Sequence, residues 1–205
     1  MEPANSQRLR SADPRVARTQ EAICAALLDL LEQETDLGAI SISSVAAAAG
    51  VTRRTFYAHF RSPEDIVRHI SSALFVEVSG SIPDQSLQLP LTGGRLGLEL
   101  FTQFQSHAGQ LRVLLSKCPM EIFHGPVKDA LAALIHRICD LNGVDRFDDF
   151  ELLALVEIAG GAGLGILSAW AERDFAEPPD RVAAVFGTLI FPGLDQFLSS
   201  GRPQQ

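Results

Sequence analysis

The stretch SISSVAAAAGVTRRTFYAHFRSPEDIVRHI, residues 41–70, decides the fold expected for this chain. Ser41 or Ser43 can cap a short alanine-rich helix that stops at Gly50, and Thr52 can cap a second short helix. Two short helices joined by a tight turn with a glycine are typical of a helix-turn-helix, whose second helix enters the major groove of DNA. The stretch therefore predicts a DNA-binding unit.

The second of these helices has two distinct faces. At about 100° per residue, Phe56 and Phe60 lie within about 40° of each other, so both are expected to face inward. The opposite half carries side chains suited to DNA: an arginine can grip guanine N7 and O6, an alanine can pack on a thymine methyl, and hydroxyl groups can donate to phosphates. These outward residues are Arg54, Thr55, Tyr57 and Ala58.

The rest of the chain shows helical patterns on both sides of one expected linker. Apolar spacing predicts a first helix over about residues 13–34, and Ser62, followed by Pro63, can cap a fourth that continues to about residue 79. Residues 80–94 are rich in glycine, proline and serine and lack periodicity, so a linker is expected there. Further helical patterns cover residues 95–106, 108–117, 126–142, 148–173 and 179–199.

These patterns predict an all-α protein of about nine helices. Its expected parts are a flexible arm at 1–14, a helix-turn-helix DNA-binding domain at 15–70, the linker at 80–94, and a C-terminal helical domain at 95–200.

The net charge of −8 is unevenly distributed. Residues 1–69 hold eight arginines and nine acidic residues, net −1, which leaves −7 for the remainder. Phosphate binding depends on the local field, so basic clusters suffice despite an acidic body. The clusters are Arg8, Arg10, Arg15 and Arg18, and Arg53, Arg54, Arg61 and Arg68.

Composition favours a folded protein of the cytoplasm. Apolar residues make up 46% of the chain, the first residues lack an apolar leader segment, and three scattered cysteines form no disulfide framework. Residues 152–170 are long enough to span a bilayer, but Glu157, four glycines and acidic flanks favour a helix buried against protein. No membrane partner is expected.

In residues 41–70, seven positions stand in register with the N-terminal domain of the tetracycline-repressor (TetR) family, which the chain resembles over about residues 15–70. These are Gly50, Val51, Thr52, Thr55, Tyr57, His59 and Phe60. The resemblance implies binding to double-stranded operator DNA through Ser43, Thr52, Arg53, Arg54, Thr55, Tyr57 and His59.

Two positions depart from the family pattern. Arg54 stands where a small residue is common, which suggests a base contact of this protein's own. Pro63 stands where the family often has a phosphate-binding lysine, a cation that Arg61 can replace.

The resemblance also implies a homodimer in which the last two helices of each chain form a four-helix bundle. Small residues let helix backbones approach closely, so the glycine-rich helix is a candidate for the dimer crossing, although an intrachain crossing explains the glycines nearly as well. The candidate dimer residues are Gly160, Gly161, Gly163, Gly165, Phe186 and Phe197.

An effector pocket is implied in the aromatic-rich stretch after the linker. Its candidate lining is Phe101, Phe104, His107, Leu111, Met120 and Phe123, with Leu114 and Leu115 nearby. Plain core explains the same spacing. A pocket of this kind is expected to take a mostly apolar organic molecule, neutral or cationic, in preference to a polyanion, for which Arg95, Arg112 and Arg137 are the residues to consider.

These features predict a transcriptional repressor that a small organic effector releases from a palindromic operator, with activation left open. No catalytic signature is present, so neither enzymatic activity nor a cofactor is expected. One alternative is a metal-sensing regulator, since Cys118, His124, His136 and Cys139 are near one another in sequence, although no metal site is expected. The other is a helical dimeric interaction protein that no longer binds DNA.

Overall fold

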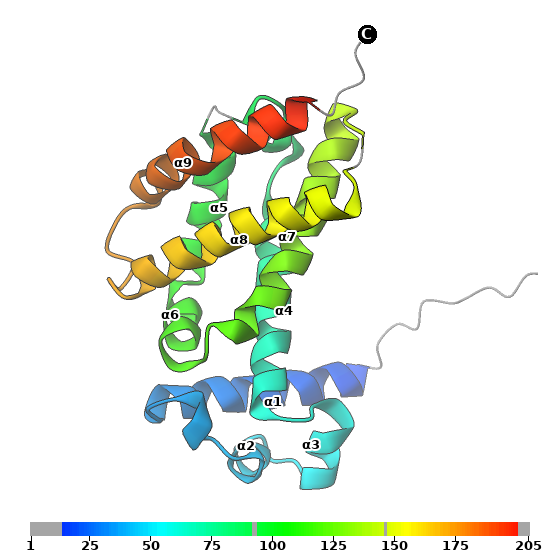
Figure 1. The fold of residues 1–205 in the computed structure, drawn as a ribbon. Coiled ribbons are helices and arrows are strands. Elements are labelled where there is room, and N and C mark those ends of the chain that lie inside the picture. Colours follow the sequence, from blue (N-terminus) through cyan, green and yellow to red (C-terminus); the bar gives the residue numbers. More distant parts are fainter. Residues whose placement is uncertain (1–13, 92–93, 146, 201–205) are drawn as a thin grey trace, which may run out of the picture.

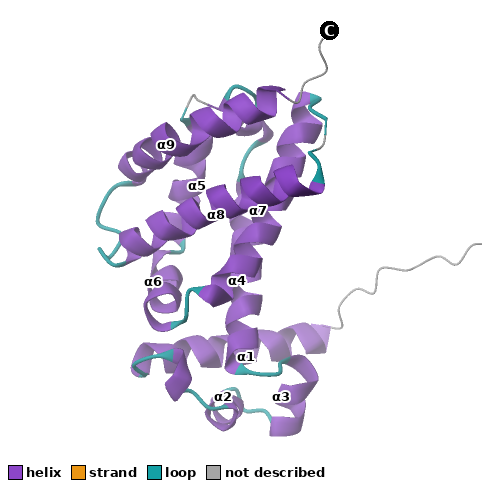
Figure 2. Ribbon diagram, in the orientation of Figure 1, coloured by secondary structure: helices purple, strands orange, loops and turns teal. Residues whose placement is uncertain are grey.

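The structure is a computed structural model that describes residues 14–91, 94–145 and 147–200. Within these residues every regular element is helical, with nine α-helices and two short 3-10 turns (Figure 2). The predicted all-α class is therefore confirmed. Nearly all of the arm expected at residues 1–14, including Arg8 and Arg10, lies outside the described residues, as do residues 92 and 93 of the expected linker.

The three N-terminal helices lie at one end of the molecule and the C-terminal helices at the other, with one long helix, α4, running between them (Figure 1). The helices are α1 (Pro14–Gln33), α2 (Ile42–Ala48), α3 (Arg53–His59), α4 (Pro63–Ser81), α5 (Arg95–Ser106), α6 (Ala108–Lys117), α7 (Glu121–Asn142), α8 (Asp149–Ala171) and α9 (Pro179–Ser200). The 3-10 turns are η1 (Leu37–Ala39) and η2 (Asp84–Leu87).

Side-chain caps fix where the DNA-binding helices begin. The Ser41 hydroxyl oxygen accepts from the Ser44 N–H at 3.0 Å, and the Ser41 N–H donates to the Ser44 hydroxyl at 3.1 Å, which together form a capping box. Thr52 caps α3 by accepting from the Thr55 N–H at 3.1 Å, and Ser62 caps α4 in the same way. Ser41, not Ser43, is thus the cap of α2.

Two connected groups of buried side chains hold the molecule together. The first begins in the DNA-binding end, where Ile23, Leu27 and Leu31 of α1 pack with Phe56 of α3 and Ile66 of α4, all fully buried. It continues along α4 into α6 and α8. The second lies at the far end, among α7, α9 and the segment that follows α4. Because α4 contributes to the core at both ends, the DNA-binding helices are packed onto the C-terminal helices.

Residues 82–91 of the segment expected to be a linker belong to the second core. Leu87 and Leu91 are buried within it. The Asn142 side chain accepts from the Leu89 N–H at 2.9 Å and donates to the Leu87 carbonyl at 2.9 Å, while Asp195 accepts from the Leu91 N–H at 2.9 Å. Side chains of α7 and α9 thus hold this part of the segment in place.

The start of α7 corrects a sequence-based expectation. The helix was expected from residue 126, because proline suits the first turn of a helix, but it begins at Glu121 and holds Pro126 buried inside it. The other predicted boundaries of α5, α6, α8 and α9 agree with the structure to within about two residues.

Candidate DNA-binding surface and internal cavity

The outward face of α3 carries the polar side chains that the sequence placed there. Phe56 is fully buried, and its ring lies 6.4 Å from that of Phe60. Arg53, Arg54 and Tyr57 are exposed, and Tyr57 retains 52% of its surface. This face lies at the end of the molecule formed by α1, α2 and α3 (Figure 1). It is therefore free to approach a partner.

The hydroxyl groups at the start of α3 are engaged locally. The Thr52 and Thr55 hydroxyl oxygens lie 2.9 Å apart, and the Thr52 oxygen also caps the helix. This arrangement fixes both side chains beside the first N–H groups of α3. A helix start of this kind can present both N–H groups and hydroxyls to an anionic oxygen.

Three arginines supply the positive charge around this face. Arg53 and Arg54 belong to α3, Arg61 follows it, and all three are exposed. Arg68, counted with them from the sequence, is instead paired with Asp65, whose Oδ1 lies 3.0 Å from its Nη1. The net positive patch is therefore narrower than the sequence suggested.

The remaining predicted DNA-facing residues lie in the same region. Ser43 is exposed on α2, and His59 is half-buried at the end of α3. All eight candidates thus lie on α2, on α3 or in the turns that flank α3. The fold therefore brings hydroxyl, phenol, imidazole and guanidinium side chains together at one end of the molecule.

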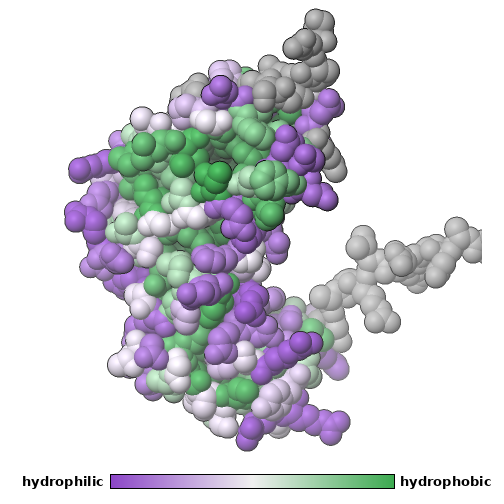
Figure 3. Space-filling view, viewed as in Figure 1, coloured by the Kyte–Doolittle hydropathy of each residue, from purple (hydrophilic) through white to green (hydrophobic). Residues whose placement is uncertain are grey.

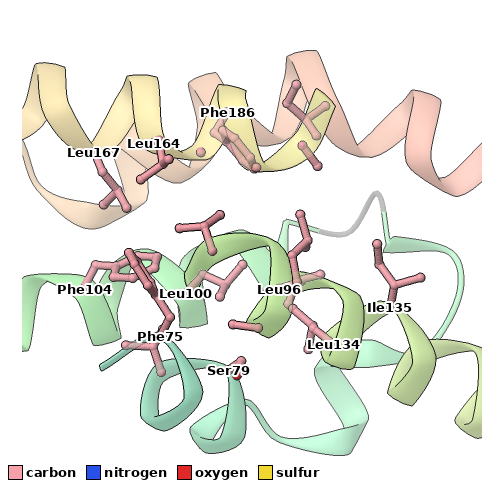
Figure 4. A pocket seen from close by; sticks show the side chains of 18 of the residues that line it. Phe75, Ser79, Leu96, Leu100, Phe104, Leu134, Ile135, Leu164, Leu167 and Phe186 are labelled. Carbon is pink, nitrogen blue, oxygen red and sulfur yellow. The ribbon is translucent and has the colours of Figure 1, made fainter. Parts of the chain in front are cut away.

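A cavity of about 120 Å³, partly open to the surface, lies among α4, α5, α7, α8 and α9. Figure 4 shows its labelled side chains from α4, α5 and α7 on one side and Leu164, Leu167 and Phe186 on the other. Of the predicted pocket residues, Phe101 and Phe104 line it. The wall also includes Phe75, Val78, Leu96, Leu100, Val127, Leu131, Leu134, Ile135, Gly160, Gly163, Ile190, Phe191 and Leu194.

The other four predicted pocket residues do not line this cavity. Leu111 and Phe123 are buried in the first core, and Met120 packs against it. His107 is half-buried with its Nε2 3.8 Å from Glu77 Oε1. The reason is that α6 packs against α1 as well as α8, so the stretch after α5 turns away from the cavity toward the DNA-binding end.

The glycines of α8 have separate surroundings. A Cβ at Gly160 would lie 3.2 Å from Val127 Cγ1 of α7, so this glycine serves an intrachain crossing. Gly163 lines the cavity, and a Cβ there would meet nothing within 4 Å. Gly161 and Gly165 are exposed, and a Cβ at either would also meet nothing within 4 Å. Only these last two lie on an uncovered face of this chain.

The two phenylalanines expected at the dimer interface contact other residues of their own chain. Phe186 lines the cavity, with its ring 5.4 Å from Phe101 and 5.8 Å from Phe191. The half-buried Phe197 lies 5.1 Å from Phe147. Phe186 therefore belongs to the cavity wall, and its place in a dimer interface stays a prediction.

A broad apolar face on α8 and α9 remains uncovered. It includes Phe150 and Leu189, each 75% exposed, with Ile158, Leu153 and Val185. In Figure 3 apolar side chains gather over this part of the molecule. Residues 149–171 and 179–198 are long and apolar enough to cross a membrane by length and composition alone. The same pattern is expected of helices that pack against another protein surface.

Two cysteines, Cys24 and Cys118, have surroundings that keep their thiols protonated. Burial raises the pKa of Cys24 to about 11 and that of Cys118 to about 12, with smaller contributions from Glu21 and Glu64 respectively. Cys118 belongs to the first core and Cys139 to the second, so the cysteines considered for a metal site are separated. Across the described ranges, no three His, Cys, Asp or Glu side chains are grouped to hold a metal ion.

Two basic side chains that the sequence did not single out for this role join segments that are far apart in the sequence. Lys117 of α6 donates from Nζ to the carbonyl oxygens of Leu31, Glu32 and Glu34 at 2.6, 3.2 and 2.9 Å. Arg137 of α7 donates to carbonyls at the end of α4 and pairs with Asp84. No spacing rule relates residues so distant in sequence, so only the fold reveals these contacts.

The fold and the exposed face of α3 together define a helix-turn-helix protein with a helical C-terminal region. The chain matches the family described as "Bacterial regulatory proteins, tetR family" over residues 26–70. This match confirms the resemblance to the TetR family over these N-terminal residues.

One relative and several solved structures extend this comparison. The uncharacterized HTH-type transcriptional regulator YxbF of Bacillus subtilis (strain 168) is 33% identical over 66 residues, which cover 32% of this chain and 17% of that protein. This chain thus matches a small part of that relative's length.

Solved structures resemble the chain over most of its length. A TetR transcriptional regulator from Streptococcus agalactiae 2603V has a TM-score of 0.59 at 20% identity, covering 86% of this chain and 95% of that one. The TetR family repressor AlkX from Dietzia sp. strain DQ12-45-1b has a TM-score of 0.57 at 19% identity, with 90% and 97% covered. The dihydroxyacetone kinase operon activator DhaS has a TM-score of 0.55 at 17% identity, with 88% and 97% covered. These likenesses show the same fold for both ends of the molecule.

Proposed function

We propose that this protein is a cytoplasmic transcriptional repressor that binds a palindromic operator as a homodimer and is released when a small organic molecule occupies the internal cavity. The observation that carries the proposal is the face of α3, which exposes Arg53, Arg54 and Tyr57 while Phe56 anchors the helix in the core. A short helix so presented can enter a major groove.

The roles on DNA follow from side-chain chemistry. Arg54 can form two hydrogen bonds with one guanine, which makes it the candidate base-reading residue. Thr52, Tyr57 and Arg61 can bind phosphates, which set position without reading sequence. The acidic remainder of the chain disfavours non-specific adhesion of the C-terminal end to DNA.

Dimer formation is supported by the uncovered apolar face of α8 and α9. Phe150, Ile158 and Leu189 are 75%, 68% and 75% exposed, and large apolar side chains gathered on one exposed face often mark a protein interaction surface. A second copy of the chain, related by a two-fold axis, would cover this face with the same face of its own. Two α3 helices would then meet two half-sites about one DNA turn apart.

A single helix provides the route from cavity to DNA. Phe75 and Val78 of α4 line the cavity, while the opposite end of α4 begins at Pro63, directly after the turn that carries Arg61. A ligand that prefers one tilt of α4 therefore also favours one position of the DNA-binding end. A preference of about 1.4 kcal/mol changes operator affinity tenfold.

The decisive experiment is selection of randomised DNA duplexes with the purified full-length protein, followed by titration of the selected duplex at several salt concentrations. We expect a near-palindromic site and an affinity that falls steeply with salt, because phosphate contacts release counterions. A protein that enriches no sequence, and binds selected and random duplexes alike, would be an interaction protein that keeps only the fold.

The sign of regulation needs a separate measurement. Among the structures of this fold, AlkX is a repressor and DhaS an activator of its operon, so the fold is compatible with both. With the selected site placed over a promoter, a repressor lowers reporter transcription. A rise in transcription would reassign the protein as an activator and leave the DNA-binding proposal intact.

A further inference from the structure

A groove of about 170 Å³, open to solvent, lies between the end of α8 and the start of α9. Trp170 and Val182 are its buried lining residues, whereas Arg173 and Arg181 line it and are exposed. Val185 also lines it and is 53% exposed on the uncovered apolar face, so the groove and this face are continuous. For comparison, an apolar cavity of about 150 Å³ holds benzene. The size of the groove therefore suits one phenyl ring.

A phenylalanine with acidic neighbours lies at the opposite end of α8. Phe150 is 75% exposed, the most exposed aromatic side chain among the described residues. Asp148 and Glu151 each accept a hydrogen bond from the other's backbone N–H, in the capping box that begins α8. Asp149 is exposed and takes no part in this capping box. An apolar ring beside a carboxylate complements an apolar groove lined by arginines.

Phe150 cannot reach the groove of its own chain. Trp170 lies 20 positions further along the same helix, which corresponds to about 30 Å at 1.5 Å per residue. A second copy can bring ring and groove together. A two-fold axis then makes the contact twice, because each copy supplies one ring and one groove.

The proposed binding to DNA fixes the direction of that axis. Both recognition helices must face the same duplex, so the two-fold axis has to run toward the DNA-binding end of the molecule. In Figure 1, α8 runs across the direction of α4, which leads to that end. A two-fold rotation about such an axis reverses the course of α8 in the second copy. The start of one α8 then lies near the end of the other.

An exposed glycine marks the centre of this antiparallel pair. Gly161 lies about midway between Phe150 and Trp170, is exposed, and a Cβ there would meet nothing within 4 Å. Two helix backbones can approach closely at a position without a side chain. Asp149 and Arg173 each lie 12 positions from Gly161, in opposite directions along α8. With the crossing at Gly161, the carboxylate of one copy therefore comes opposite the guanidinium of the other.

From these relations we infer that two copies pair their α8 helices antiparallel, with Phe150 of each copy in the groove between α8 and α9 of the other. Asp149 of one copy and Arg173 of the other form an ion pair beside each ring. Exposed ion pairs contribute little, so the buried ring supplies most of the affinity and the charges fix the register. The inference rests on the proposed homodimer and adds the register and the contacts of its interface.

A cysteine placed at the axis tests the register. In the full-length protein, Gly161→Cys should be joined to its partner by a short bis-maleimide cross-linker, because the two thiols would face each other. Ala169→Cys is the matched control on an exposed part of α8. Its two thiols would be about 24 Å apart along the helices, beyond the reach of the reagent. The parent protein, with its three native cysteines, gives the background. Cross-linking of Ala169→Cys, or none of Gly161→Cys, would overturn the register.

The ring and the ion pair are tested through the dimer dissociation constant, measured by sedimentation equilibrium. Phe150→Ala should raise the constant roughly tenfold or more, whereas Val76→Ala, which shortens an exposed apolar side chain of α4, should leave it unchanged. Asp149→Arg and Arg173→Asp should each raise it, and the double variant should recover much of the loss. Loss of the Arg173 pair with Glu177 in the same chain cannot produce such a recovery, because both variants that carry Arg173→Asp lack that pair.

These measurements separate the inference from the proposed function. If Gly161→Cys is cross-linked and Phe150→Ala weakens the dimer, both stand. If the parent is a dimer and Phe150→Ala dimerises equally well, the homodimer stands and the contact of ring and groove fails. If the parent is monomeric at every concentration that binds the selected operator, the proposed homodimer fails and the inference fails with it.

Discussion

Lys117 Nζ lies 2.6 Å from the carbonyl oxygen of Leu31, a residue 86 positions earlier in the chain. Two more carbonyls at the end of α1, those of Glu32 and Glu34, accept from the same ammonium group. The last carbonyls of a helix have no partner within the helix and carry its negative end. The ammonium group of Lys117 therefore gives these carbonyls a hydrogen-bond donor. It also links the DNA-binding helices to α6 of the C-terminal region.

Replacing Lys117 should weaken the junction between the two ends of the molecule. We expect Lys117→Met to lower the free energy of unfolding by about 1–3 kcal/mol, because the carbonyls lose a charged donor. Urea denaturation measures this. Lys128→Met is the matched control, since Lys128 pairs with Glu157 at the surface and an exposed pair contributes about 0–1 kcal/mol. Equal losses in both variants would show that the junction does not depend on Lys117.

The base-reading role of Arg54 predicts a loss of selectivity. Arg54→Ala should cost about 1–3 kcal/mol on the selected operator and relax the sequence preference at one position of each half-site. Tyr57→Phe should weaken binding to operator and random duplexes more evenly, as expected for a phosphate contact. Both are measured by fluorescence anisotropy. If Arg54→Ala weakens both duplexes equally, Arg54 contacts the backbone.

The dimer face can be disrupted without touching the DNA-binding end. A glutamate at Leu189 places a charge in the apolar face of α9, so Leu189→Glu should be monomeric by light scattering and should lose operator binding at the same time. Val76→Glu introduces the same charge at an exposed apolar residue of α4, away from α8 and α9, and should remain dimeric. A dimeric Leu189→Glu protein would locate the interface elsewhere.

The glycines of α8 should respond differently to the same substitution. Gly160→Leu forces atoms against Val127 of α7 and should destabilise the fold by about 1–3 kcal/mol. Gly163→Leu has open space and should unfold at or above the parent's urea midpoint, because leucine is the better helix former. The sequence offered no reason to distinguish these two positions. A larger loss at Gly163 than at Gly160 would contradict the packing described here.

The cysteines predict a loss of stability in alkaline solution. Burial raises the pKa values of Cys24 and Cys118 to about 11 and 12, so the folded protein holds these protons more tightly than the unfolded chain, in which a thiol has a pKa near 8.5. Their contribution is fully present below about pH 8.5 and is lost as pH rises through about 11 to 12. Chemical denaturation at pH 7.5 and pH 10 should show a smaller decline for Cys118→Ala than for the parent. Identical declines would remove Cys118 from this effect.

The DNA-binding end could be predicted from the sequence because its determinants are local. Ser41, Thr52 and Ser62 each cap a helix through a residue three positions later, and the inward and outward faces of α3 follow from its periodicity. The cavity could not be predicted from the sequence, because its wall comes from five helices. Their apolar positions follow the same spacing whether they face a cavity or one another. Leu111 and Phe101 illustrate this: both are buried, and only one lines the cavity.

The unbroken course of α4 has a mechanical consequence. Its 19 residues measure about 28 Å, with the cavity wall near one end and the DNA-binding helices at the other. A tilt of about 5° about the cavity end would displace the far end by about 2.4 Å over a helix of that length. In a two-fold dimer both arms swing, so the spacing between the recognition helices changes by as much as twice that amount. A small tilt of α4 at the cavity thus becomes a larger displacement of the recognition helices, and the cavity itself needs no large motion.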